Sequence, residues 1–482
     1  MEIWLVLAIL SLVTYYLVKH NVSSITRTPV WLLWSVIMAP AAIWTLWWLI
    51  YGENTPLPPL LILGPFILCP LFYFWLIEKG RITPEPSTSE LKASPTEIKP
   101  IGSEEEKTLR NCFPGSLYFL QHIDYKPQAI LCRGKLKAIP EVAYQTIKEN
   151  VEKAFGDRFL VLFQESLQGQ PFFALVTNPW AKSPTPADRE VIFRPGLALG
   201  LLATTFFFTT WMGVRLTGIE DEQLFTNLHL FSKGLPYSLG LLTILGVHEL
   251  SHYGAALYYK IRTTLPYFMP VPFFLGTFGA FIQMKSPIPH RRALFDVGIA
   301  GPLGGMLVTI PILLLGLYWS QIVPLDTKDH SLLNFQALNP RFSFLLAILA
   351  KISLGNSLGV GDAIDLHPLA VAGYIGLIIT ALNLLPVGQL DGGHIVHAMY
   401  GQKIAVVVGQ ITRFLVLILS LVKPDFLIWA VFLMLMPISD QPALNDVTEL
   451  DNRRDILGLF SLVLLIMILL PLPRVIAQWM SL

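Results

Sequence analysis

The chain has 482 residues, of which 53% are hydrophobic and only 14% are charged, whereas soluble globular proteins carry about 25% charged residues. This composition excludes an ordinary water-soluble protein and predicts a polytopic α-helical membrane protein that has the lipid bilayer as a partner. A formal net charge of +1 leaves no overall basic field, so no nucleic-acid partner is expected. The three cysteines are too few and too irregularly spaced for a disulfide-stapled domain.

Apolar runs that could cross about 30 Å of hydrocarbon recur along the chain. The first three fall within residues 1–77 and predict an N-terminal transmembrane region. Because the first run opens with Met-Glu rather than with basic residues, it is expected to be an anchor and not a cleaved signal peptide. The ninth run is short enough for a tilted half-span. The ten predicted spans are Ile3–Val18, Val30–Tyr51, Leu57–Ile77, Gly196–Val214, Leu235–Tyr259, Ala293–Trp319, Leu369–Leu385, Ile404–Val422, Phe426–Met436 and Ile456–Leu472.

The chain changes character between the third and fourth runs, where nearly half of all its charged residues lie. Residues 78–101 and 179–194 are rich in proline and polar side chains and are predicted to be linkers. Between them, residues 102–178 are expected to form a small soluble α/β or α+β domain, inserted before a transmembrane domain at 195–482. Its predicted elements are strands at 129–131, 158–164 and 172–177 and an amphipathic helix at 140–155 that ends at Gly156.

Basic residues in the short loops predict how the spans are oriented, because Lys and Arg are enriched on the cytoplasmic side of a membrane. With the spans above, six basic pairs fall on one side and the acidic run Glu220–Glu222 falls on the other. The side that carries the basic pairs, and the soluble domain with it, is therefore expected to face the cytoplasm, or the stroma in an organelle. The pairs are Lys19 and Arg27, Lys79 and Arg81, Arg189 and Arg194, Lys260 and Arg262, Arg291 and Arg292, and Arg453 and Arg454.

The fifth predicted span contains the pattern His-Glu-x-x-His, formed by His248, Glu249 and His252. A spacing of four residues places both imidazoles on one face of a helix, where they can bind one Zn²⁺. Glu249 can then reach a water at the metal without ligating the ion. The alternative is a pair of hydrogen-bonded histidines at a membrane interface. Three ionisable groups within one turn of an apolar span are costly without such a partner, which favours the metal site.

A catalytic zinc site usually has three protein ligands and one open position, so a third ligand is needed. Asp391 is a candidate, because it follows a span that returns to the side of His248. Asp391-Gly392 is also a strong turn signal, and could simply close a helix. His394 and His397 are a competing source of the third ligand, and the sequence pattern leaves these alternatives open.

At this point the chain resembles the site-2 protease family of intramembrane zinc metalloproteases. That family pairs His-Glu-x-x-His with Asn-x-x-Pro-x(4)-Asp-Gly at the end of a later span, and here Asn383, Pro386, Asp391 and Gly392 complete the second motif. The sequence of residues 277–305 is most similar to that of the branch found in plastids and photosynthetic bacteria, which is named after ethylene-dependent gravitropism-deficient and yellow-green plants. The resemblance covers the chain from about Gly196 to its end.

The resemblance implies a role for each matching residue. His248, His252 and Asp391 would hold one zinc ion, and Glu249 would act as general base and then as proton donor to the leaving amine. Asn383 would orient the substrate or stabilise the developing oxyanion. The implied activity is hydrolysis of peptide bonds within transmembrane segments of other membrane proteins, with single-pass proteins as the expected substrates. The implied location is a plasma or thylakoid membrane.

The Pro- and Gly-rich segment Pro266–Met284 is predicted to be re-entrant or hairpin-like, because irregular backbone at membrane depth must be buried in protein or line a cavity. In site-2 proteases the corresponding segment forms strands beside the active site. Its edge could pair with an unwound substrate, and a purely structural hairpin is the alternative. The residues predicted for this pairing are Gly276, Phe278, Ala280 and Gln283.

A different class of function also fits a polytopic protein with intramembrane carboxylates, namely a transporter or a catalytically silent membrane chaperone or scaffold. The spans show no internal repeat and no pair of broken helices, which are the usual sequence signs of transport. The peptidase is therefore the favoured hypothesis, and stoichiometric zinc is the property that separates the two.

Overall fold

The computed structural model forms two compact units, residues 1–97 and 98–482, which are described separately. The first unit contains a pair of packed helices, α2 (Val30–Tyr51) and α3 (Pro59–Lys79). These helices confirm the second and third predicted apolar runs as helical, whereas the first run, Ile3–Val18, lies mostly outside the described residues. The structure describes residues 11, 14–15, 18–19, 28–52, 55, 58–80, 101–126, 129–166, 169–179, 194–219, 223–224, 227–272, 275–325, 334–422 and 426–480.

The soluble region contains a four-stranded antiparallel sheet with two helices. All of its strand pairs are antiparallel, so the α+β alternative holds, and the sheet order is β1-β2-β4-β3. The predicted helix and the three predicted strands are confirmed, while α4 and β1 were not predicted. The elements are α4 (Ser103–Asn111), β1 (Tyr118–Lys126), β2 (Ala129–Leu136), α5 (Pro140–Phe155), β3 (Phe159–Glu165) and β4 (Pro171–Thr177).

Helix α5 shows why this region folds as the sequence indicates. Pro140 stands in its first turn, where a missing N–H costs nothing. Its buried side chains recur every three or four residues and face the sheet. Gly156 ends the helix with a φ of +60°, a conformation that favours glycine.

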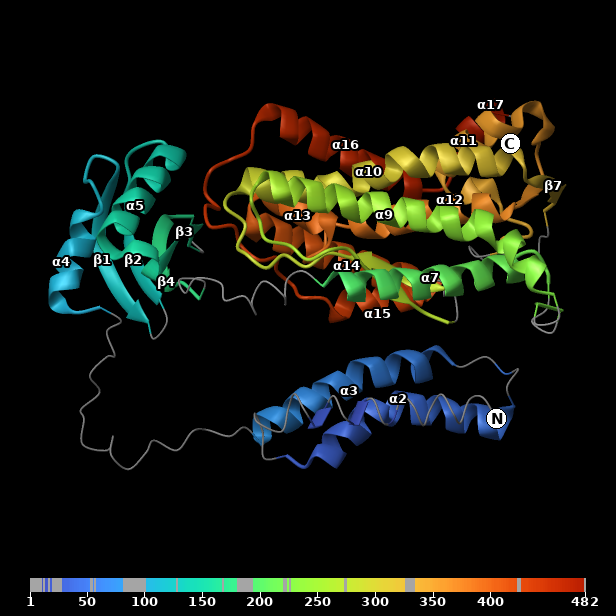
Figure 1. Cartoon of the computed structure of the whole chain (residues 1–482), viewed down its shortest axis with the longest axis horizontal. Coiled ribbons are helices and arrows are strands. Elements are labelled where there is room, and N and C mark those ends of the chain that lie inside the picture. The colour runs from blue at the N-terminus through green and yellow to red at the C-terminus, as the bar shows by residue number, and fades with distance from the viewer. Residues whose placement is uncertain are drawn as a thin grey trace. The chain divides into compact units, whose positions relative to one another are not determined.

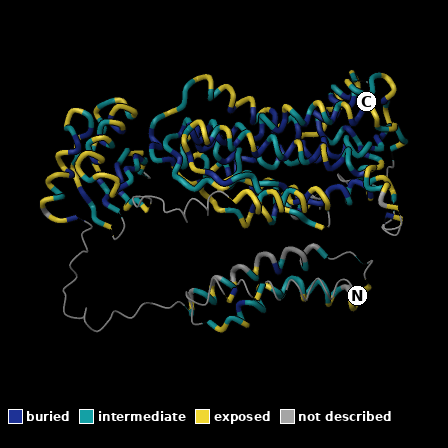
Figure 2. Tube along the Cα trace, in the orientation of Figure 1, coloured by how far each residue is buried: buried dark blue, intermediate teal, exposed yellow. Residues whose placement is uncertain are grey.

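The remaining helices form a bundle in which α10 packs against both α9 and α12 (Figure 1). Buried residues are concentrated inside this bundle and exposed residues on its outside (Figure 2). Many of the exposed residues are large and apolar. Five helices of the described residues are long and apolar enough to cross a membrane, among them α7, α9 and α10. The bundle helices are α7 (Pro195–Arg215), α9 (Leu235–Tyr258), α10 (Arg291–Tyr318), α11 (Phe344–Leu354), α12 (Pro368–Leu384), α13 (Asp391–Tyr400), α14 (Gln402–Val422), α15 (Leu427–Leu435), α16 (Asn452–Leu469) and α17 (Arg474–Trp479).

Two short hairpins accompany the bundle. The first pairs β5 (Tyr267–Pro270) with β6 (Thr277–Phe281), which confirms the predicted hairpin in this segment. Strand β5 packs against α7, and β6 contacts α9 close to the His-Glu-x-x-His turn. The second hairpin pairs β7 (Gln321–Pro324) with β8 (Asp362–Asp365).

Candidate metal centre

Helix α9 brings His248 and His252 together as their four-residue spacing predicts. Both side chains are buried, with 4% and 7% of their surface exposed, and their Nε2 atoms lie 3.2 Å apart. Two imidazole nitrogens that face one another in an apolar helix need a shared partner, because unpaired buried polar groups are costly. The turn of α9 therefore presents two metal donors to a single point.

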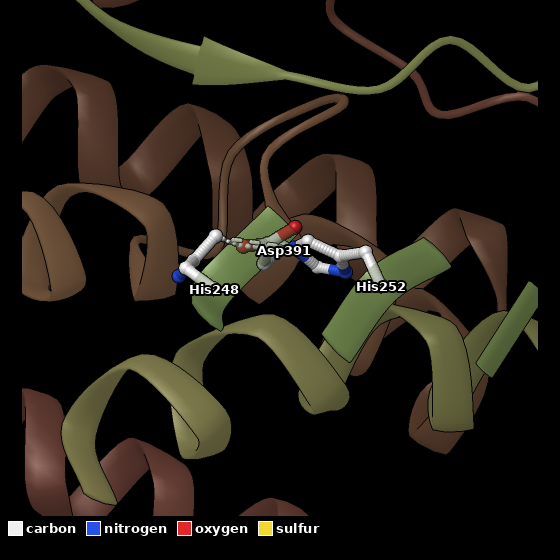
Figure 3. Close-up of side chains that lie close together, drawn as sticks. All are labelled: His248, His252 and Asp391. Carbon is white, nitrogen blue, oxygen red and sulfur yellow. Dashed lines mark hydrogen bonds and ion pairs between the residues drawn. The ribbon is translucent and has the colours of Figure 1, made fainter. Parts of the chain in front are cut away.

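Asp391 supplies a third donor at the same point. It is the first residue of α13, and its Oδ2 lies 3.3 Å from Nε2 of His248 and 3.3 Å from Nε2 of His252. In Figure 3 the two imidazoles stand on either side of the Asp391 carboxylate. Within the described residues, these three side chains form the group able to hold a metal ion.

The triangle of donor atoms fits zinc. A tetrahedral zinc ion with ligands at about 2.0–2.1 Å keeps its donors about 3.3–3.4 Å apart, close to the three distances of 3.2, 3.3 and 3.3 Å found here. Two imidazoles and one carboxylate are a known donor set of catalytic zinc sites. Three protein donors leave one coordination position open.

Contacts around the donors fix their orientation. Nδ1 of His252 lies 2.7 Å from the carbonyl oxygen of Val297 in α10. Nδ1 therefore carries the proton and donates a hydrogen bond to that oxygen, which leaves the lone pair of Nε2 available to bind a metal. Gly301, one turn further along α10, lies directly against the same ring. A methyl group there would stand 2.0 Å from Nε2 of His252. The close approach of α9 and α10 therefore requires glycine at this position.

A cavity of about 440 Å³ opens at the donor triangle. Glu249 lines this cavity together with the three donors and is 94% buried. Asn383 also lines it, with its amide nitrogen 3.2 Å from Nε2 of His248. The residues of the two motifs that were predicted to bind the metal or to act in catalysis thus meet at one cavity. They are His248, Glu249, His252, Asn383 and Asp391.

The four residues predicted to pair with a substrate strand do not share one environment. Ala280 and Gln283 line the cavity. Phe278 is 72% exposed, and Gly276 packs against the backbone of α7 near Thr209 with a φ of +82°. The cavity-facing part of this segment is therefore its C-terminal half.

His394 and His397 were the competing candidates for the third ligand. His394 lines the same cavity, but neither histidine belongs to the group able to hold a metal ion among the described residues. His394 Nδ1 lies 2.7 Å from Asp440, and His397 contacts both Asp440 and Asp446 at 3.0 Å. Sequence reasoning missed these two aspartates. The signal that could have found them was a pair of acidic residues in a loop between two apolar helices.

Comparison with known proteins gives the class of this domain. Residues 236–422 match the sequence model of peptidase family M50. The chain therefore carries a peptidase family M50 domain, which confirms the resemblance to the site-2 proteases, and it is an integral membrane protein.

Individual relatives support the resemblance to the plastid branch. Over 350 residues the chain is 30% identical to "Probable zinc metalloprotease EGY2, chloroplastic" of Arabidopsis thaliana, covering 71% of this chain and 60% of that protein. It is 35% identical over 238 residues to "Probable zinc metalloprotease EGY1, chloroplastic" of the same plant, covering 49% and 43%. A rice EGY2 protein (Oryza sativa subsp. indica) is 31% identical over 71% of this chain and 62% of its own length. The chain thus spans less than two thirds of each of these relatives.

Proposed function

We propose that this protein is an intramembrane zinc endopeptidase that hydrolyses peptide bonds in the transmembrane segments of other membrane proteins. The observation that carries this proposal is the donor triangle of His248, His252 and Asp391 at a cavity that also contains Glu249. The zinc metalloprotease names of the relatives support it.

The residues at the cavity divide the chemistry between them. His248, His252 and Asp391 would hold zinc, which would supply a Lewis acid for the scissile carbonyl and lower the pKa of a bound water toward about 7. Glu249 takes a proton from the attacking water as the new C–O bond forms. It returns that proton to the amine nitrogen as the C–N bond breaks. Asn383 donates from its amide to the substrate carbonyl oxygen, where negative charge develops.

The segment after α9 is proposed to hold the substrate in an extended form. Ala280 and Gln283 lie at the cavity, and β6 belongs to a sheet of only two strands among the described residues. A peptide unwound from its helix could add to this sheet and satisfy its backbone groups there. A hairpin with a purely structural role is the alternative. With a purely structural hairpin, Ala280→Pro is expected to leave the KM for substrate unchanged.

Single-pass membrane proteins are the proposed substrates, and the thylakoid membrane or a bacterial plasma membrane is the proposed location. The chloroplastic names of the relatives support the thylakoid membrane. The active site and the soluble domain are proposed to face the cytoplasm or stroma, on the side of the basic loops. The soluble domain at 102–178 is proposed to filter or dock substrates.

The decisive test replaces Glu249 by glutamine in the purified full-length protein. Cleavage of a transmembrane substrate is expected to fall by about 10²–10⁴-fold, while zinc content, measured by atomic absorption, stays at that of the wild type. Ser251→Ala is a matched control, because Ser251 lies on the same turn and its hydroxyl bonds only to the carbonyl of Val247 among the contacts described. Retained cleavage in Glu249→Gln would contradict the role of general base.

Zinc content separates the peptidase from the transporter or silent chaperone. Wild-type protein is expected to hold one zinc ion, and His248→Ala is expected to lose it. Wild-type protein that purifies without zinc and cleaves no transmembrane substrate would favour the rival function.

A further inference from the structure

A second cluster of ionisable side chains lies one helical turn beyond Asp391. Oδ2 of Asp440 lies 2.7 Å from Nδ1 of His394 and 3.0 Å from Nδ1 of His397. Asp446 contacts the other ring nitrogen, Nε2, of His397 at 3.0 Å. His397 is fully buried and both aspartates are buried. The cluster is thus a paired network inside the protein and not a set of surface ion pairs.

The helix that carries these histidines is short and is held at both ends. Helix α13 has ten residues, too few to be stable by itself in water. At its C-terminal end, Arg291 of α10 donates to the carbonyl oxygens of Ala398 and His397 at 2.9 and 3.3 Å. At its N-terminal end the first turn packs on Gly298 of α10, where a methyl group would stand 2.9 Å from Cβ of His394. Small movements of α13 therefore move Asp391.

Asp440 contacts the first turn of α13 from outside that helix. His394 lies three residues after Asp391, on the same side of the helix. His394 and Asp440 both line the cavity that contains the metal donors. A contact to His394 therefore acts on the same turn that presents Asp391 to the histidines of α9.

The segment that carries Asp440 is itself held by two neighbours. Its backbone donates from Leu444 to Ile288 at 2.8 Å and from Asn445 to Pro289 at 3.1 Å. On its other side, Phe163 of β3 donates to the carbonyl of Leu444 at 2.6 Å, and Asp446 donates to the carbonyl of Phe163 at 2.9 Å. Residues 443–446 therefore extend the sheet of the soluble domain and connect it to the chain just before α10.

We propose that Asp440 is a positioning residue of the peptidase site, which fixes Asp391 through His394 and His397 and is in turn held by the soluble sheet. This inference rests on the proposed function, because it assigns Asp440 to the same metal centre. It gives the soluble domain a role that a tethered substrate filter does not have: its strand β3 supports the wall of the active-site cavity.

Two readouts on purified full-length protein test the proposal. In Asp440→Ala, the affinity for zinc, measured by competition with a chelator, is expected to fall about tenfold, at the lower end of effects reported for residues that orient metal ligands. Cleavage should lose kcat with little change in KM. Amide hydrogen exchange in α13 should become faster. Asp440→Asn, which keeps an acceptor for one histidine, should lie between Asp440→Ala and the wild type.

Asp446→Ala is the matched comparison from the same loop. It removes a contact to His397 but leaves both contacts of Asp440, so its zinc affinity should fall less than that of Asp440→Ala. If Asp440→Ala does not fold, the order wild type, Asp446→Ala, Asp440→Asn carries the same test.

The possible failures can be told apart. Faster exchange in α13 with unchanged zinc affinity and unchanged kcat would show a purely structural role and would overturn the proposal. Equal zinc affinities in all variants would do the same. Wild-type protein that binds no zinc would instead contradict the proposed function, whatever the exchange in α13.

Discussion

The soluble domain and the transmembrane bundle of this protein bury different kinds of side chain. Among the described residues of 102–178, the buried side chains are apolar or neutral, with Tyr118, Phe163 and Phe173 at the centre, and no Asp, Glu, His, Lys or Arg is buried. The bundle, which lies in the more apolar surroundings, buries two histidines and a glutamate of α9 and the His397–Asp440–Asp446 network. The region with less access to water is thus the one that keeps charges inside.

The free-energy cost of burying a charge explains this difference between the two interiors. In the soluble domain, burial raises the pKa of the Cys132 thiol to about 12, because the apolar interior disfavours its charged form. The bundle faces the same penalty, and its buried histidines meet it by pairing with aspartates at hydrogen-bond or ligand distance. The interior of the bundle thus holds the groups that can do chemistry, whereas the apolar interior of the soluble domain contributes stability.

The largest expected effect that tests this contrast comes from Gly301→Ala. The added methyl group would stand 2.0 Å from Nε2 of His252 and must displace the imidazole. We expect loss of stoichiometric zinc and at least about a 100-fold fall in cleavage, because small misplacements of reacting groups are this costly. Zinc analysis and a cleavage assay of the purified variant measure both.

Gly304→Ala provides the control for that substitution. It adds the same methyl group to α10, but the atom it meets is the hydroxyl of Ser251, at 2.1 Å, which is not a metal donor. Zinc should remain bound in Gly304→Ala. Equal zinc loss in both variants would show that the contact between the two helices, and not the imidazole, is what the methyl group disturbs.

A smaller effect is expected from the other interior. Ile147 is fully buried in α5, and Ile147→Val should lower the stability of the soluble domain by about 0.5–1.5 kcal/mol. Zinc affinity should not change, since all three donors lie on α9 and α13. Hydrogen exchange over residues 102–178 measures the first and chelator competition the second.

Val142→Ala on the same helix is the reference for Ile147→Val. Val142 is 49% exposed, so its truncation should change stability by no more than about 0.5 kcal/mol. If Ile147→Val weakened zinc binding without unfolding the domain, the separation between a stabilising and a chemical interior would be wrong.

The same contrast explains how much of the molecule could be predicted from its sequence. Helix α5 was predicted to the residue because Pro140 and Gly156 mark its ends, and the donors of α9 followed from helical spacing alone. Strand β1 was missed because Gln121, His122 and Asp124 interrupt its apolar pattern. Asp440 and Asp446 were missed because an acidic pair in a loop does not by itself show which side chains it meets, and their contacts to His397, 43 and 49 residues away, form only in the folded chain.

The smallest expected effect tests one of the contacts between the two regions, next to the segment that carries Asp440. The amide of Gln164 in β3 donates to the carbonyl of Ala443 at 2.8 Å, beside the backbone pairing of residues 443–446. A hydrogen bond of this kind is worth about 0.5–1.5 kcal/mol, so Gln164→Ala should speed exchange of the Asp446 amide by about two- to tenfold.

Gln145→Ala is the matched control for Gln164→Ala, because Gln145 lies in the same domain and its amide bonds to Glu149 on the exposed face of α5. Exchange at Asp446 should be unchanged there. Because the segment that loses support in Gln164→Ala also carries Asp440, zinc affinity should fall in the same direction but by less than in Asp440→Ala. Faster exchange at Asp446 with zinc affinity fully retained would mean that the sheet only fastens the soluble domain to the bundle, and that the charged interior is positioned by the bundle alone.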